Sequence, residues 1–128
     1  MTIRPTLLVV DDDPDTLDGW TLSLQGAGFD VVTATDGIEA LATAQAIVPD
    51  LVVLDLELPG RSGYDVATLL RQNPATRHIP LIAATGFSHE ARLERARRVG
   101  FDVIMVKPCD PVDLIGHIER LIADAASE

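Results

Sequence analysis

The stretch DLVVLDLELPGRSGYDV, residues 50–66, contains an apolar run, an aspartate, a Pro-Gly turn and the start of a helix pattern. The run 51–56 is rich in Val and Leu and lacks a polar alternate face, as expected of a strand that helices cover on both sides of a parallel sheet. After Gly63, apolar residues recur at helical spacing until Asn73 and Pro74 interrupt the pattern. We therefore expect a buried strand that ends near Asp55, followed by an amphipathic helix.

The same unit repeats on both sides of this stretch. Four further apolar runs fit strands, at residues 7–10, 31–34, 81–84 and 103–106. Start signals for the other helices are Asp13 with Pro14, Asp36 with Glu39 as a capping box, Ser88, and Asp110 with Pro111; end signals are Gly26 or Gly28, Pro49, Gly100 and the final AASE. Alternating strands and helices predict an α/β fold with a doubly wound parallel sheet.

Composition places limits on the class of protein. The 128 residues are 47% apolar, which suits one domain over residues 1–128. A net charge of −10 disfavours nucleic acid as a partner and favours a cation or a basic protein surface. Cys109 is the single cysteine, no signal peptide is evident, and no apolar run approaches the roughly 20 residues that span a bilayer. We expect a soluble cytoplasmic protein without a membrane segment.

Polar residues close four of the predicted strands. Asp11 and Asp12 follow the first, Asp55 the third, Thr85 the fourth and Lys107 the fifth. Ligands of such sheets bind at the carboxyl ends of the strands, so these side chains are expected to converge on one rim. Clustered carboxylates favour Mg²⁺, which keeps open positions where a phosphoryl oxygen can bind. Lys107 and the cation then neutralise a transferring phosphoryl group, Thr85 donates a hydrogen bond and Asp55 attacks.

Each of these residues has an ordinary explanation when it is taken alone. The run DDDPD is typical of a helix start, and Asp13 and Asp15 are expected to be only that. Asp55 can be a loop aspartate, Thr commonly closes a strand, and Lys107 before Pro108 can be an exposed turn residue. The functional interpretation depends on all four strand ends carrying a chemically complementary set.

Four segments resemble the signature segments of response-regulator receiver domains, which are CheY-like phosphoacceptor domains. The segments are LLVVDDDPD, DLVVLDLELPGRSGYDV, IAATGF and VGFDVIMVKPCD, and the resemblance covers about residues 6–123. It implies the flavodoxin-like (βα)5 fold with strand order 2-1-3-4-5.

The resemblance also implies roles for individual residues. Asp11 and Asp12 match the acidic pair, Asp55 the phosphoacceptor, Thr85 the hydroxyl residue and Lys107 the family's lysine. Asp12, Asp55 and the backbone carbonyl of Glu57 would bind the metal directly, and Asp11 would act on it mainly through water. A cis Lys107–Pro108 peptide is expected. One departure is Ile104, at a position that often carries a Tyr or Phe that rotates on phosphorylation, so the aromatic half of the switch is in doubt. The combination of ATGF, GFD and Ile104 is similar to receivers of hybrid histidine kinases.

The implied function is a phosphoacceptor switch in a two-component or phosphorelay system. Asp55 receives a phosphoryl group from a histidine kinase or histidine phosphotransfer protein in a Mg²⁺-dependent reaction, and the signal passes to an unknown output protein by contact. The chain is then a monomer or a phosphorylation-dependent dimer, and not an enzyme beyond its own phosphorylation and dephosphorylation.

Three alternatives use the same fold. A phosphohydrolase of the haloacid-dehalogenase kind needs D-x-D-x-[TV] near the start of the chain, whereas Glu57 and Pro59 occupy the matching places and the acidic pair comes first. A nucleotide- or flavin-binding module needs a loop after the first strand that is rich in Gly, Ser or Thr, and three aspartates there repel phosphate. A receiver that no longer phosphorylates is disfavoured because every matched site residue is retained.

Four arginines, Arg92, Arg95, Arg97 and Arg98, fall in the fourth predicted helix. Glu90 and Glu94 lie at helical spacing from them, so we expect a solvated basic face with these two glutamates as local partners. A docking patch is the alternative.

Overall fold

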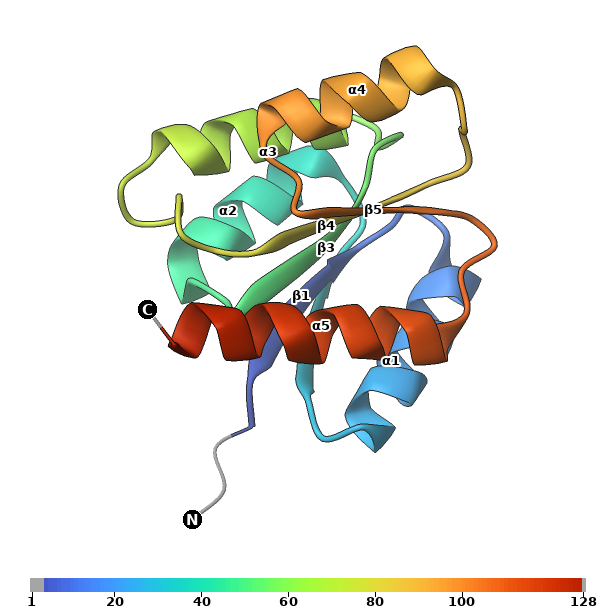
Figure 1. Cartoon of the computed structure of the whole chain (residues 1–128), viewed down its shortest axis with the longest axis vertical. Coiled ribbons are helices and arrows are strands. Elements are labelled where there is room, and N and C mark those ends of the chain that lie inside the picture. Colours follow the sequence, from blue (N-terminus) through green and yellow to red (C-terminus); the bar gives the residue numbers. More distant parts are fainter. Residues whose placement is uncertain (1–3, 128) are drawn as a thin grey trace.

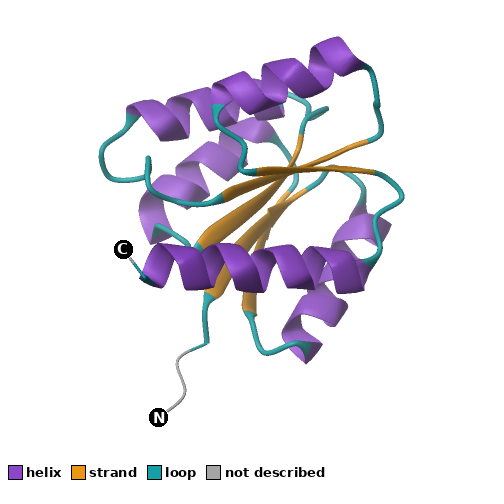
Figure 2. Ribbon diagram, in the orientation of Figure 1, coloured by secondary structure: helices purple, strands orange, loops and turns teal. Residues whose placement is uncertain are grey.

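The computed structural model describes residues 4–127 of the chain. Its elements alternate without exception, as Figures 1 and 2 show. In chain order they are β1 (Thr6–Val10), α1 (Pro14–Gly26), β2 (Asp30–Ala34), α2 (Gly37–Ile47), β3 (Leu51–Asp55), α3 (Gly63–Gln72), β4 (Leu81–Thr85), α4 (Glu90–Val99), β5 (Val103–Val106) and α5 (Pro111–Ala126). Within the described residues no helix is both long and apolar enough to cross a membrane.

The five strands form one parallel sheet in the order β2-β1-β3-β4-β5, which confirms the predicted fold class and strand order. Helices α1 and α5 cover one face, and α2, α3 and α4 cover the other (Figure 1). Two apolar clusters lie between sheet and helices, and alternate residues of β1 enter opposite clusters: Leu8 and Val10 face α2 and α3, while Leu7 and Val9 face α1 and α5.

Burial differs between the middle and the edges of the sheet. Every residue of β3 and β4 is buried, as is β1 after its first residue, in agreement with their continuous apolar runs. The run of β5 also lacks a polar alternate face, which predicts coverage on both sides, but this is not observed because β5 is an edge strand: Val103, Ile104 and Met105 are only partly buried and Val106 is 40% exposed.

Most predicted helix starts are correct. Asp13, Asp36 and Asp110 are N-caps whose carboxylates accept backbone N–H groups of the first turn. The capping box is only half formed, because the Glu39 carboxylate accepts from the Thr35 hydroxyl. Helix α4 begins at Glu90, two residues after Ser88, and its N-cap His89 makes no capping bond through its side chain.

Gly63 lets α3 begin directly against the end of β3. Its N–H donates to the Leu56 carbonyl over 3.0 Å. A Cβ at Gly63 would lie 2.3 Å from the carbonyl oxygen of Asp55 and 2.7 Å from the Cα of Leu56, both backbone atoms. Only glycine fits there, so the close approach of α3 to the backbone of Asp55 and Leu56 depends on Gly63.

Val48 is the C-cap of α2 and has a left-handed backbone with φ 45° and ψ 71°. A β-branched side chain is strained in this region, and this one is 40% exposed, so little packing offsets the strain. We predict that Val48→Gly raises the free energy of unfolding by about 1 kcal/mol in urea titrations. Val48→Ala removes a similar apolar surface but keeps Cβ, so its free energy of unfolding should rise less than that of Val48→Gly. An equal rise in the two variants would show that backbone strain is not the cause.

Candidate functional site

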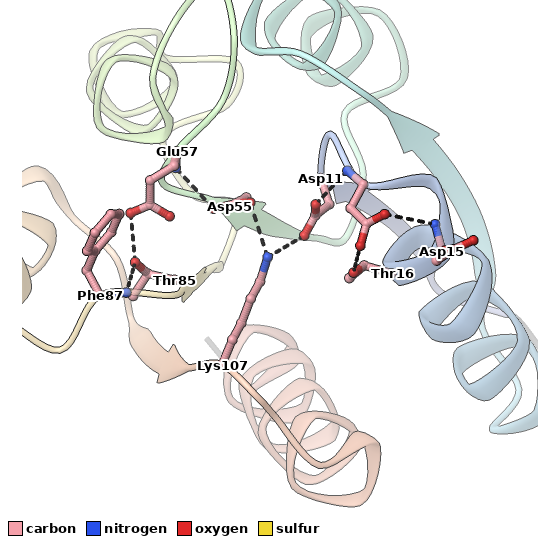
Figure 3. Close-up of polar contacts among 9 residues, drawn as sticks. Asp11, Asp15, Thr16, Asp55, Glu57, Thr85, Phe87 and Lys107 are labelled. Atoms are coloured by element: carbon pink, nitrogen blue, oxygen red, sulfur yellow. Dashed lines mark hydrogen bonds and ion pairs between the residues drawn. The ribbon is translucent and has the colours of Figure 1, made fainter.

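The structure brings together the polar residues that close four strands (Figure 3). Asp55 is the last residue of β3 and Thr85 the last of β4, while Asp11 follows β1 and Lys107 follows β5. Parallel strands end at the same edge, so residues up to 96 positions apart meet at one rim. The Lys107–Pro108 peptide that follows β5 is cis, as predicted.

Three carboxylates lie at the centre of this rim. Asp11, Asp12 and Asp55 each offer an oxygen atom, and these atoms all lie within 4.8 Å of one another. Asp11 and Asp55 are only 1% and 5% exposed, whereas Asp12 is exposed. Oxygen ligands with one side open to solvent fit a hard divalent cation that keeps part of its water shell, such as Mg²⁺.

Lys107 bridges the two buried carboxylates. Its Nζ donates to Oδ2 of Asp11 over 2.6 Å and to Oδ2 of Asp55 over 3.1 Å. The other oxygens accept backbone N–H groups, Asp11 Oδ1 from Asp13 and Asp55 Oδ1 from Glu57. Within residues 4–127, no buried side-chain nitrogen or oxygen is left without a partner. The carboxylate of Asp55 is thus oriented from both sides before any ligand binds.

Burial is the strongest influence on the charge of Asp55. It raises the pKa of this carboxyl to about 6, against the opposing effects of the Glu57 N–H bond and the Lys107 ammonium. For Lys107, burial lowers the pKa, but the hydrogen bonds and charges of Asp11 and Asp55 outweigh it and the pKa is raised. The lysine is therefore firmly charged, and a further cation beside Asp55 would favour the charged form of its carboxyl.

Thr85 lies at the rim as expected, but its hydroxyl points to the side chain of Glu57. From the sequence, a role was predicted only for the backbone carbonyl of Glu57. Oγ1 of Thr85 donates to Oε1 of Glu57 over 2.8 Å and accepts the N–H of Phe87 over 3.1 Å. Figure 3 shows both bonds beside the Asp55–Lys107 contact. No spacing rule links Glu57 to Thr85, because the contact depends on how the loop after β3 approaches the end of β4.

The four arginines of α4 are exposed, as predicted, but the prediction that Glu90 and Glu94 are their partners is only partly correct. Arg97 does pair with Glu90 and Glu94, each over 3.2 Å. Arg92 instead stacks on the Phe87 ring, 4.2 Å from its centroid, and Arg95 stacks on the ring of Tyr64. Phe87 lies in the loop before α4 and Tyr64 lies in α3, so the spacing within α4 does not reveal these contacts.

Ile104 lies away from the carboxylates, on β5, and is partly buried against the core on the α4 side. It lines a hollow of about 250 Å³ together with Leu93, Arg97, Phe101, Asp102 and Val106. The structure thus places this aliphatic residue beside open space between α4 and the edge strand.

Comparison with protein families matches residues 7–119 to the response regulator receiver domain. The DNA-binding response regulator MtrA of Mycolicibacterium smegmatis is 37% identical over 117 residues, which are 91% of this chain and 50% of that protein. The chain therefore spans about half the length of this relative.

Two solved structures have the same fold. The signal receiver domain of a histidine kinase from Syntrophus aciditrophicus is 29% identical, with a TM-score of 0.89 over 94% of this chain and 92% of that one. The receiver domain of a sensor histidine kinase from Pseudomonas aeruginosa is 26% identical, with a TM-score of 0.88 over 94% and 99%, and holds a magnesium ion in its active site cleft.

The raised pKa of Asp55 predicts that its charge destabilises the metal-free fold. The folded-state pKa of about 6 exceeds the usual 3.8, so the cost is absent below pH 4, grows between pH 4 and 6 and is complete above that. We expect Asp55→Asn, which is neutral, to raise the free energy of unfolding by about 2–3 kcal/mol at pH 8 in EDTA, and little at pH 3.5. Urea titrations at both pH values test this.

The exposed Asp18 on α1 provides the matched control, because Asp18→Asn removes the same charge from a residue outside the carboxylate cluster that makes no ion pair with Lys107. A stability gain that is independent of pH, or equal in both variants, would contradict the burial argument.

Proposed function

This chain belongs to the family of response regulator receiver domains, and we propose on that premise that it is a phosphoacceptor switch with Asp55 as the acceptor. Receiver domains are the signalling domains of two-component systems. The observation that carries the assignment to Asp55 is the single ammonium of Lys107 shared by Asp11 and Asp55, with the Asp12 carboxylate beside them.

In the proposed reaction, an oxygen of Asp55 forms a bond to phosphorus while the bond from phosphorus to the donor nitrogen or oxygen breaks. The product is an acyl phosphate on Asp55, and the donor leaves with the electron pair and takes a proton from solvent where it needs one. The Glu57 N–H and Lys107 orient the nucleophile before the reaction.

The equatorial phosphoryl oxygens carry the charge that the site must neutralise. Lys107 supplies one positive charge close to Asp55. Asp11, Asp12, Asp55 and the backbone carbonyl of Glu57 would hold Mg²⁺, which when bound screens the charge between nucleophile and phosphoryl group. Thr85 would donate to a phosphoryl oxygen, which requires its hydroxyl to leave Glu57.

We propose a histidine kinase or a histidine phosphotransfer protein as the donor, and a protein contact as the output. The receiver of a histidine kinase among the structural neighbours supports attachment to, or exchange with, such a kinase. The DNA-binding relative is about twice as long as this chain, so its DNA contact is a property of that protein. Residues 1–128 would form one receiver domain, and the family match favours this role over that of a haloacid-dehalogenase-like phosphohydrolase.

Incubation with acetyl phosphate, with and without Mg²⁺, tests the acceptor. Intact-mass measurement should show a gain of one phosphoryl group that needs Mg²⁺ and is lost in Asp55→Asn. Asp18→Asn, which removes the same charge elsewhere, should be labelled like the wild type. Absence of labelling from acetyl phosphate and from a histidine kinase would contradict the proposed function, and labelling of Asp55→Asn would contradict the assigned residue.

The metal assignment has an independent test in calorimetric titration with Mg²⁺ at pH 8. Asp12→Ala removes the exposed oxygen ligand and leaves the Lys107 bridge in place, so it should weaken Mg²⁺ binding by roughly tenfold or more. Asp18→Asn controls for the loss of one negative charge from an acidic protein. Equal Mg²⁺ affinity in the two variants would show that Asp12 is not a ligand.

A further inference from the structure

Four side chains beside the carboxylate cluster form a closed ring of contacts. Thr85 donates its hydroxyl to Glu57, and the N–H of Phe87 donates to the same hydroxyl oxygen. The Arg92 guanidinium lies over the Phe87 ring and 4.0 Å from Oε1 of Glu57, the oxygen that accepts from Thr85. Figure 3 shows the Glu57, Thr85 and Phe87 side of this ring, which continues through Arg92 of α4.

The backbone of Arg92 is also held by α3, because its carbonyl accepts a hydrogen bond from the hydroxyl of the buried Tyr64 over 3.3 Å. Its side chain is about half exposed, whereas that of Glu57 is 32% exposed. The first turn of α4 is therefore connected to the end of β4 by two routes, one through a carboxylate and one through an aromatic ring.

We propose that Arg92 is a positioning residue that couples the Thr85 hydroxyl to the first turn of α4 through Glu57 and Phe87. The inference rests on the proposed function, because the event that moves the Thr85 hydroxyl is the arrival of a phosphoryl group on Asp55. It adds a residue on α4 that has no contact with the carboxylate cluster.

The argument begins with the single proton of the hydroxyl. Thr85 can donate to Glu57 or to a phosphoryl oxygen, but not to both. When Thr85 turns to the phosphoryl group, the partly buried Glu57 carboxylate loses the donor at 2.8 Å. An anion without a donor is unfavourable in such a place, and the guanidinium of Arg92 is its cationic neighbour.

The distance between these two groups leaves room for movement. Charge-assisted hydrogen bonds have donor–acceptor distances of about 2.7–2.9 Å. At 4.0 Å, the Arg92–Glu57 pair is open while Thr85 occupies Glu57. When the Arg92–Glu57 pair closes, the guanidinium of Arg92 moves toward the end of β3. The N–H of Phe87 is bonded to the Thr85 hydroxyl oxygen, so when that oxygen moves the Phe87 ring under the guanidinium moves too. Differential contact in the two states is the requirement for coupling.

This route to α4 does not involve strand β5. Ile104 offers no hydroxyl or ring, and it packs against the apolar core beside a hollow that Glu57, Thr85, Phe87 and Arg92 do not line. A signal carried by Arg92 would therefore appear in the first turn of α4 while the amides of β5 change little.

The test uses amide chemical shifts of the labelled full chain, with Mg²⁺ and beryllofluoride added as a stable mimic of the acyl phosphate. In the wild type, shift changes should extend from Thr85 through Phe87 to residues 90–93 of α4. In Arg92→Gln they should remain at Asp55 and Thr85 and fall about fivefold at residues 90–93. Arg92→Lys, which keeps the charge and loses the stacking guanidinium, should restore part of the change.

Arg98→Gln is the matched control, because it removes an exposed arginine from the same helix. It should transmit the change as the wild type does. Full transmission to residues 90–93 in Arg92→Gln, or equal loss in Arg98→Gln, would overturn the proposal. No change at Asp55 in the wild type would instead contradict the proposed function.

A second arm needs no phosphoryl mimic. Thr85→Val removes the hydroxyl, so Glu57 loses its donor in the resting protein. The amides of residues 90–93 should then shift in Thr85→Val, and should shift much less when Thr85→Val is combined with Arg92→Gln or Glu57→Gln. Equal shifts in the single and double variants would overturn the coupling through Arg92, whatever the outcome with beryllofluoride.

Discussion

Two buried carboxylates that share one ammonium are the constraint around which the rest of this molecule is organised. Asp11 and Asp55 lie almost out of water, and neither would be tolerated there as a bare anion. Lys107 reaches both carboxylates from the end of β5, at 2.6 Å and 3.1 Å, because the parallel strands in this order bring the ends of β1, β3 and β5 to one edge. The starts of α1 and α3 also help to place these carboxylates. The N–H of Asp13, the N-cap of α1, donates to Asp11, and Gly63 at the start of α3 packs against the backbone of Asp55.

Much of the fold could be predicted from the sequence because its signals are local. Continuous apolar runs mark the buried strands, and Asp or Pro at the helix starts marks the caps. The strand order came from family resemblance, and the exposure of Val106 was missed because edge position is a property of the assembled sheet. Ser62, whose hydroxyl caps α3, was also missed, since Gly63 dominated the pattern at that start.

The candidate site shows the same division. That Asp11, Asp55, Thr85 and Lys107 share a rim follows from strand ends, which can be read along the chain. The pairing of Thr85 with Glu57 could not be read in this way, because it depends on the rotamers of a side chain at the end of β4 and of one in the loop after β3. Helix spacing correctly predicted the partners of Arg97. It failed for Arg92, whose side chain stacks on an aromatic ring outside α4 and does not pair with a glutamate of the helix.

The acidic rim also acts on molecules that have not yet bound. Free phosphorylated metabolites are anions, and they approach Asp55 against the field of a chain of net charge −10. A donor presented on a protein with a basic surface approaches along that field, and dissolved salt weakens both effects over about 8–10 Å. If Asp55 accepts a phosphoryl group as proposed, the net negative charge would slow small anionic donors relative to a protein donor with a basic surface, and this difference would shrink as ionic strength rises.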